Sequence, residues 1–187
     1  MLTPAQRRAL LDLARASVTA RVTGTAPPAP DSADLPDVQA AAFVSLHRRG
    51  DLRGCIGSLE RDEALADVVA RCAASAATED PRFPPVIPAE LPAMDLEISV
   101  LGPLERIDPV DPAAVEIGRH GLVVEQGGRR GLLLPQVAVE WGWDRETFLA
   151  HACRKAGLPA DAWRTGAVAY RFEALVFGEA ETASPPA

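Results

Sequence analysis

One stretch decides the fold of this 187-residue chain: Leu52-Arg53-Gly54-Cys55-Ile56-Gly57. Its apolar residues, bounded by turn residues, predict a β-strand over residues 52–58. A second apolar segment, residues 40–48, predicts the preceding strand. Between them stands Arg49-Gly50-Asp51, which is typical of a tight turn. The two segments therefore predict an antiparallel hairpin.

A three-residue turn fixes which residues of the hairpin face each other. It places Ser45 opposite Cys55 and His47 opposite Arg53. These four polar side chains would share one face, and Arg53 and Cys55 share a face in any regular strand because the strand period is two. A change of one residue in the loop would alter this pairing.

Gly54 and Gly57 flank the cysteine. A glycine inside a strand marks a bulge or a close approach of another backbone, so the sequence predicts room for a ligand at this strand. Arg53, with His47, would favour the thiolate of Cys55, which makes a nucleophilic or redox role chemically available. The alternative is that Cys55 is a small buried hydrophobic residue, the more common role of a free cysteine.

A second candidate segment is Asp80-Pro81-Arg82-Phe83, in which proline excludes a regular helix. Its aspartate and arginine are predicted either to contact a ligand or to form a structural salt bridge. Glu97 lies on the polar face of an alternating strand over residues 94–101. It would pair with one of the arginines or act as a base.

The remaining pattern predicts an α+β fold with largely antiparallel sheets and flanking helices, in two lobes sharing one core. Residues 23–37 are rich in proline and predict an exposed connector, and residues 180–187 predict a flexible tail. The other expected elements are helices from Thr3-Pro4 onward, over 62–77 and over 146–156, a hairpin of 121–126 with 131–135, and a strand over 167–177.

Composition narrows the function. A net charge of -7 and a pI of about 5.0 argue against broad nucleic-acid binding. No apolar run reaches the ~18–20 residues that cross a bilayer, no signal peptide is evident, and the three cysteines are odd in number and widely spaced. We therefore expect a cytoplasmic protein. No histidine or cysteine spacing typical of a metal site occurs, and no nucleotide-binding motif, so neither a metal nor a cofactor is expected.

A set of motifs, in this order, resembles the AMMECR domain family, whose prokaryotic members are called AmmeMemoRadiSam system protein A. The resemblance covers about residues 5–179 as a single domain. The motifs are Phe43-Val44-Ser45-Leu46, the 52–57 hexapeptide, Asp80-Pro81-Arg82-Phe83, Leu96–Leu101, His120-Gly121-Leu122, Leu133–Ala138, Trp143-Asp144, Phe148-Leu149 and Lys155–Leu158.

The resemblance implies an α+β fold in two unequal subdomains, and it implies a Memo-type protein and a radical S-adenosylmethionine enzyme as functional neighbours. It supplies no reaction. The residues it marks as a shared surface are Arg53, Gly54, Cys55, Gly57, Asp80, Arg82 and Glu97.

Three functions stay open from the sequence. The leading one is an accessory protein whose groove around the 52–57 strand holds a small anionic ligand or a partner segment. The second is an enzyme with Cys55 as nucleophile or redox thiol and with His47 or Glu97 as base. The third is a nucleic-acid-binding or regulatory factor that uses basic residues near the hairpin, namely Arg48, Arg49, Arg53 and Arg61.

Overall fold

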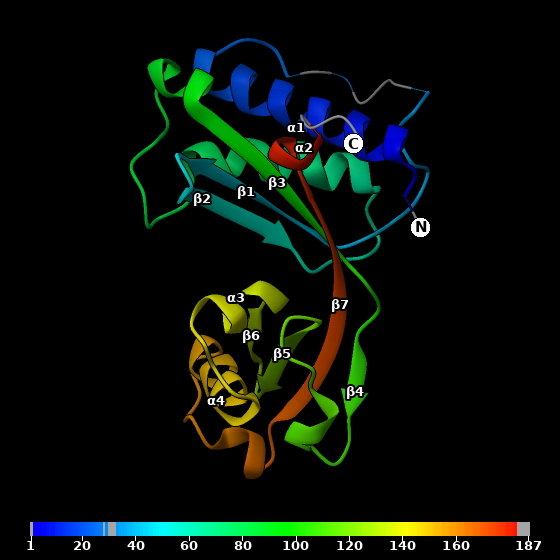
Figure 1. Ribbon diagram of the computed structural model, residues 1–187, viewed down its shortest axis with the longest axis vertical. Coiled ribbons are helices and arrows are strands. Elements are labelled where there is room, and N and C mark those ends of the chain that lie inside the picture. The colour runs from blue at the N-terminus through cyan, green and yellow to red at the C-terminus, as the bar shows by residue number, and fades with distance from the viewer. Residues whose placement is uncertain (1, 28, 30–32, 183–187) are drawn as a thin grey trace. The chain divides into compact units, whose positions relative to one another are not determined.

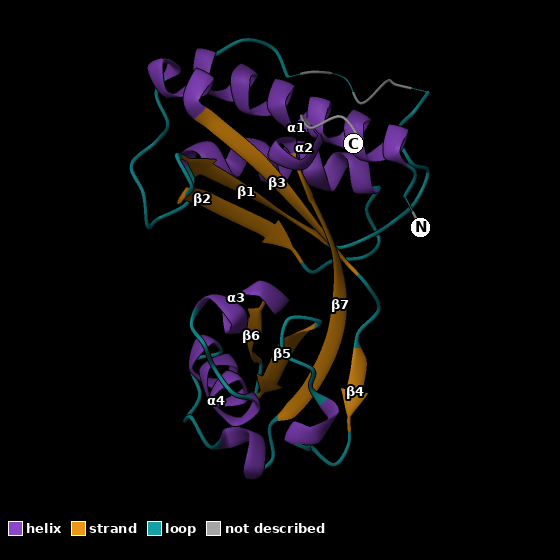
Figure 2. Cartoon of the chain, viewed as in Figure 1, coloured by secondary structure: helices purple, strands orange, loops and turns teal. Residues whose placement is uncertain are grey.

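The computed structural model describes residues 2–27, 29 and 33–182 (Figure 1). The chain forms two compact units: unit 1 comprises residues 1–100 and 175–187, and unit 2 comprises residues 101–174. Helices and antiparallel strand pairs occur in both units (Figure 2), so the predicted α+β class is confirmed. No helix in the described part of the chain is both long and apolar enough to pass through a bilayer.

Unit 1 combines two long helices with the hairpin and one further strand. The hairpin strands β1 (Ala42–Arg48) and β2 (Asp51–Ser58) are antiparallel, and β1 also pairs with β3 (Met94–Leu101). The order β2-β1-β3 leaves β2 at the edge of the sheet, with the end of β7 (Val168–Gly178) on the other side of β3. The helical elements of unit 1 are α1 (Pro4–Thr23), α2 (Leu65–Thr78), the 3-10 helix η1 (Pro88–Ala93) and α5 (Glu179–Thr182).

The predicted start of α1 is confirmed. The Thr3 hydroxyl accepts a hydrogen bond from the Gln6 amide, and the Gln6 side chain accepts one from the Thr3 amide, at 3.2 and 2.9 Å. This reciprocal capping satisfies amides that have no partner inside the helix. Gly24 ends the helix in the left-handed conformation, with φ of 72°.

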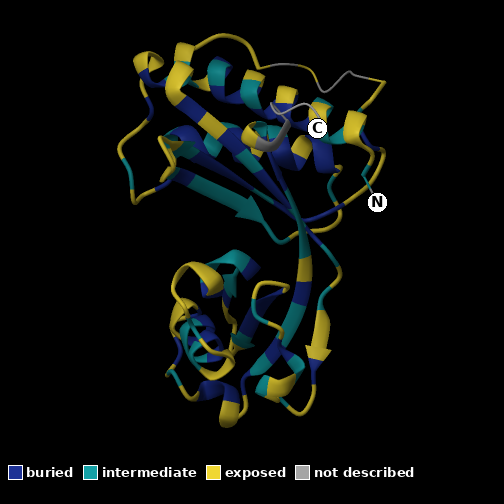
Figure 3. Ribbon diagram, viewed as in Figure 1, coloured by how far each residue is buried: buried dark blue, intermediate teal, exposed yellow. Residues whose placement is uncertain are grey.

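One face of the unit 1 sheet is covered by α1 and α2 (Figure 1). Val44, Leu46 and Ile98 point into this side and are fully buried, and the buried stripe of α2 packs with them. The helix predicted over 62–77 is present, and five apolar residues at helical spacing form its buried stripe: Leu65, Val68, Val69, Cys72 and Ala76. In Figure 3 exposed residues recur along α1, whereas α2 is mostly buried or intermediate. The residues of β1 that alternate with Val44 and Leu46, including Ser45, belong to the opposite face.

Unit 2 is built around the hairpin of β5 (His120–Gln126) and β6 (Arg129–Leu133), which turns at Gly127-Gly128 as predicted. The strand β7 pairs with β5 on one side and with β4 (Glu105–Ile107) on the other. The helix α4 (Arg145–Lys155) contacts both hairpin strands. Three shorter helical segments, which the sequence pattern did not predict, complete the unit: η2 (Pro112–Ala114), α3 (Pro135–Glu140) and η3 (Ala162–Arg164).

Each unit has its own hydrophobic cluster. The unit 1 cluster includes Leu10, Val44 and Leu65, and the unit 2 cluster includes Phe148 and Leu149. The predicted sharing of one core is therefore corrected to two clusters. The chain can divide its apolar residues in this way because the segment 101–174 contains its own helix and hairpin.

The connector and the tail are only partly described. The predicted connector 23–37 begins with the last residue of α1, and residues 28 and 30–32 lie outside the described residues. The predicted tail 180–187 begins with the turn of α5, and residues 183–187 lie outside the described residues.

Candidate functional site

The hairpin turn contains two residues, Arg49 and Gly50, and not the three predicted. Both have positive φ, 55° and 88°, as a two-residue turn of the type that matches strand twist requires. His47 consequently faces Leu52 and not Arg53, which corrects the predicted pairing. The register then shifts between Leu46 and His47, so that Ser45 faces Cys55 as predicted. Arg53 is the additional residue of this bulge, a feature that redirects a side chain.

Arg53 is held by carbonyl and carboxylate oxygens of unit 1. Its Nε and Nη2 donate to the two carboxylate oxygens of Glu90, each at 3.0 Å. Its Nη1 and Nη2 also donate to the carbonyls of Pro84 and Pro85, at 2.8 and 3.3 Å. Arg48 donates to the same Glu90 carboxylate at 3.1 Å. Arg53 thus has a structural role: its hydrogen bonds connect the 84–90 segment to the bulge.

Glu90 was missed by the sequence analysis. Its hydrogen bond from Arg53, then that from the Ile87 amide at 3.0 Å, lower the pKa of its carboxyl. The sequence nevertheless contained a signal for this role. Glu90 follows Pro88 by two residues, and a glutamate in the first turn after a proline is typical of a helix N-terminus, where its carboxylate binds backbone amides.

Asp80 and Arg82 cap the outer edge of β2. The Asp80 carboxylate accepts a hydrogen bond from the Cys55 amide at 2.8 Å, and Arg82 Nη2 donates to the Cys55 carbonyl at 3.3 Å. The two side chains also bind each other, with Arg82 Nε at 2.9 Å and Nη2 at 2.6 Å from Asp80 oxygens. The pair therefore occupies the amide and carbonyl of Cys55, which this edge strand would otherwise offer to another strand. The salt bridge predicted as one alternative for this segment is present.

The pKa of Asp80 reflects this arrangement. Its side chain is 2% exposed, so the charge must be balanced locally. The hydrogen bonds from Arg82, followed by that from the Cys55 amide, outweigh burial and lower the pKa of the carboxyl to about 2. Asp80 is therefore charged at neutral pH.

The thiol of Cys55 is partly exposed and protonated at neutral pH. Burial is the largest influence and raises its pKa, while the hydrogen bond from Ser45 and the charge of Arg82 act in the opposite direction. The Ser45 hydroxyl donates to the sulfur at 3.3 Å. The expectation that Arg53 would favour the thiolate is not met, because Arg53 binds Glu90 and the nearby cation is Arg82.

Glu97, Ser45 and Cys55 lie side by side on three neighbouring strands and form one row across the sheet. Ser45 of β1 faces Cys55 on one side and Glu97 of β3 on the other. The negative charge of Glu97 contributes to the raised pKa of Cys55. His47 lies one position along on that face, between Leu52 and Asp95. The three predicted catalytic side chains thus lie on neighbouring positions, with Ser45 at their centre.

The two glycines of the hexapeptide have packing roles. A Cβ on Gly54 would overlap the carbonyl oxygen of Ala76 in α2, and a Cβ on Gly57 would overlap the ring of Phe43. The room predicted for a ligand beside these glycines is therefore occupied by a helix backbone and an aromatic ring.

The other cysteines are fully buried in the two clusters, Cys72 in unit 1 and Cys153 in unit 2. Within residues 33–182 and the other described positions, no group of three or more His, Cys, Asp and Glu side chains is placed to hold a metal ion.

Comparisons with known proteins match this chain to a family model, to archaeal relatives and to a solved structure. The AMMECR1 family model matches residues 11–177. A protein of Methanothermobacter thermautotrophicus is 48% identical over 181 residues, covering 92% of this chain and 93% of the relative. One from Methanosarcina acetivorans is 45% identical and covers 97% and 95%. The crystal structure of the uncharacterized protein PH0010 from Pyrococcus horikoshii is similar with a TM-score of 0.86, at 40% identity, covering 91% of this chain and 89% of that one.

Proposed function

Because the chain belongs to the AMMECR1 family, we propose that it is a cytoplasmic accessory protein that binds a ligand or partner and acts with a Memo-type protein and a radical S-adenosylmethionine enzyme. The binding surface in this proposal lies on the face of the unit 1 sheet opposite α1 and α2. It comprises the partly exposed Cys55 and Glu97, on either side of the buried Ser45, together with the adjoining Arg82.

The observation that carries the proposal is the state of the charged groups around β2. Arg53 is bound to Glu90, Asp80 is bound to Arg82, and the Cys55 thiol is protonated. Such a site has a fixed shape and fixed donors, but it lacks an activated nucleophile. Fixed donors suit recognition, because little side-chain entropy is lost when a partner binds.

Arg82 is the residue of this surface that suits an anionic group. Its side chain is 50% exposed although it binds Asp80. An arginine oriented by one carboxylate can present remaining N–H groups to a second one, or to a phosphate. The bound group in the proposal is therefore an anion, carried by a small ligand or by a partner segment.

Native affinity purification tests the proposal. The tagged protein is co-expressed with the Memo-type and radical S-adenosylmethionine proteins of the same organism, and captured proteins and small molecules are identified by mass spectrometry. We expect recovery of at least one partner, reduced at least tenfold by Arg82→Gln. The matched control is Arg154→Gln in unit 2, an exposed arginine outside this surface. Thermal melting verifies that both variants fold.

Two results would contradict the proposal. One is that the wild-type protein recovers neither partner and no small molecule. The other is that Arg82→Gln, still folded, recovers as much partner as the control variant.

The second candidate function is an enzyme that uses Cys55. The hydroxyl of Ser45 on the sulfur and the carboxylate of Glu97 in the same row favour it. The raised pKa counts against it, because the thiolate is the nucleophilic form. A nucleic-acid role has less support, since Arg48 and Arg53 share the charge of Glu90. Absence of salt-dependent RNA or DNA retention on a filter would dismiss that role.

A further inference from the structure

Unit 2 contains a polar pocket that is separate from the β2 surface. Its volume is about 500 Å³, within the range of small-molecule sites. Every lining residue belongs to unit 2, and together they supply three arginines, three glutamates and one histidine. These are Arg119, Arg145, Arg171, Glu105, Glu116, Glu173 and His120. The formal charges of the arginines and glutamates cancel, but both signs are present within one cavity.

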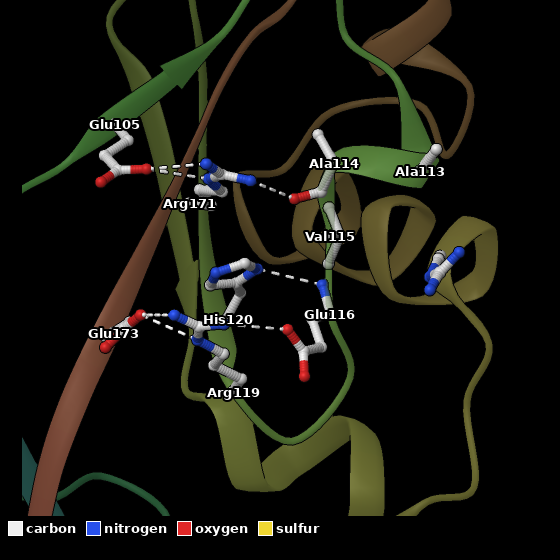
Figure 4. Close-up of a pocket in the computed structure, with 10 residues that line it drawn as sticks. Glu105, Ala113, Ala114, Val115, Glu116, Arg119, His120, Arg171 and Glu173 are labelled. Atoms are coloured by element: carbon white, nitrogen blue, oxygen red, sulfur yellow. Dashed lines mark hydrogen bonds and ion pairs between the residues drawn. The ribbon is translucent and has the colours of Figure 1, made fainter.

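Two of the arginines are held in place by the glutamates. Arg171 donates through Nε to Glu105 at 2.9 Å and through Nη1 to the Ala114 carbonyl at 2.7 Å. Arg119 donates through Nε to Glu173 at 2.8 Å and through Nη1 to Glu116 at 3.2 Å. Exposed pairs of this kind contribute little to stability. Their effect is to fix charges of both signs around the cavity (Figure 4).

His120 supplies a neutral hydrogen-bond donor. It is 8% exposed, and its Nδ1 accepts a hydrogen bond from the Glu116 amide at 3.0 Å. The proton of the neutral ring is therefore on Nε2. Burial, followed by the charges of Arg171 and Arg119, lowers the pKa of His120 and keeps the ring neutral. In Figure 4 the ring lies between the Arg171–Glu105 pair and the Arg119–Glu173 pair.

Arg145 has no comparable partner. It is exposed, and within the described part of the chain it makes no ion pair. It is also the first residue of α4, directly after the N-cap Asp144. A cation at this end is opposed by the helix dipole, so the stability of α4 does not account for it. An exposed arginine in the pocket wall favours a bound anionic group.

We propose that this pocket binds a small zwitterionic molecule of the amino-acid type. The carboxylate of the ligand binds Arg145, its ammonium group binds carboxylate oxygens of Glu105, Glu116 or Glu173, and the Nε2–H of His120 is a further donor to the ligand. A simple anion fits less well because it would lie near three glutamates, and a simple cation would lie near three arginines. The proposal does not depend on the function assigned to the β2 surface.

Calorimetric titration of the full-length protein with each of the twenty proteinogenic amino acids tests this. We expect saturable binding of at least one. For the tightest binder, N-acetylation removes the ammonium charge and amidation removes the carboxylate charge, and each is expected to weaken binding at least tenfold. These derivatives test both charges without changing the protein.

Variants test the pocket itself. Arg145→Ala is expected to weaken binding at least tenfold, whereas Arg154→Ala, in the last turn of the same helix, leaves it unchanged. The proposal is overturned if no amino acid binds saturably, if either derivative binds as tightly as the parent, or if Arg145→Ala binds like wild type.

Discussion

In unit 1 a helix backbone lies against a strand glycine, Gly54, and in unit 2 another helix does the same at Gly131. A Cβ would overlap the Ala76 carbonyl of α2 at the first position and the amide of Ala156, directly after α4, at the second. Each unit also has an aromatic ring over a glycine of the neighbouring strand. Phe43 covers Gly57 in unit 1, and Phe172 covers Gly121 in unit 2.

The difference between the units is where these glycines lie. In unit 1 both are on β2, on either side of Cys55, whereas in unit 2 they are on two strands, β6 and β5. Since the same packing occurs in unit 2 without a cysteine between the glycines, the glycines of the hexapeptide are explained by packing. The features that packing leaves unexplained are the thiol in unit 1 and the charged pocket in unit 2.

The largest expected effect comes from the two glycines under helices. Gly54→Ala and Gly131→Ala should each reduce the free energy of unfolding by about 3 kcal/mol, because a rigid backbone must move to admit the methyl group. Urea unfolding measures this. The control is Gly128→Asn, at a φ of 79° with open space around it, where we expect a change below about 1 kcal/mol. If one substitution changed the free energy of unfolding much less than the other, the two units would not share this packing.

The second expected effect is a pH dependence of the free energy of unfolding that comes from Asp80 in unit 1. The pKa of Asp80 is lowered from its ordinary value near 3.8 to about 2, which corresponds to about 2 kcal/mol. This stabilisation is present above the unfolded-state pKa and is lost as the pH falls from about 4 towards 2. Asp80→Asn should therefore lower the free energy of unfolding at pH 7 by about 2 kcal/mol and have less effect near pH 2.

Unit 2 provides the control for that measurement. Glu173 pairs with Arg119 through exposed side chains, 60% and 58% accessible, so Glu173→Gln should leave the acid dependence of urea unfolding close to that of wild type. An equal loss of acid dependence in both variants would show that Asp80 has no special contribution.

The third and smallest expected effect is the loss of unfolding free energy when a methyl group is added to a glycine beneath an aromatic ring. Phe172 is 1% exposed, whereas Phe43 is partly exposed and has more freedom to move. Gly121→Ala should therefore cost about 2 kcal/mol and Gly57→Ala about 1 kcal/mol. Thermal and urea unfolding of both variants measure the difference. A larger cost at Gly57 would contradict the packing account of the hexapeptide.

Sequence patterns predicted the hairpin, the pairing of Ser45 with Cys55 and the helix over 62–77, because periodicity and turn residues are local signals. They missed the two-residue turn, since Arg49 adopts a positive φ that non-glycine residues seldom take. That error hid the bulge at Arg53.

Partners distant in sequence were also beyond local patterns. Glu90 is 37 residues from Arg53, and nothing in the periodicity of either segment joins them. The helix backbone against Gly54 is a tertiary contact of the same kind, for which the glycine alone was the signal. The pocket residues of unit 2 come from β4, η2, the 115–119 segment, β5, α4 and β7 and are brought together only by the fold.

The central claim is that Cys55 belongs to a binding surface as a protonated thiol. The direct test is alkylation of the native wild-type protein with iodoacetamide across a pH series, with the Cys55 peptide quantified by mass spectrometry. Cys72 and Cys153 are fully buried and serve as internal references for intact folding. We predict that the midpoint for Cys55 lies above the ordinary thiol pKa of about 8.5, because burial is the largest influence on it. A midpoint below about 7.5 would show a thiolate at neutral pH and contradict the account.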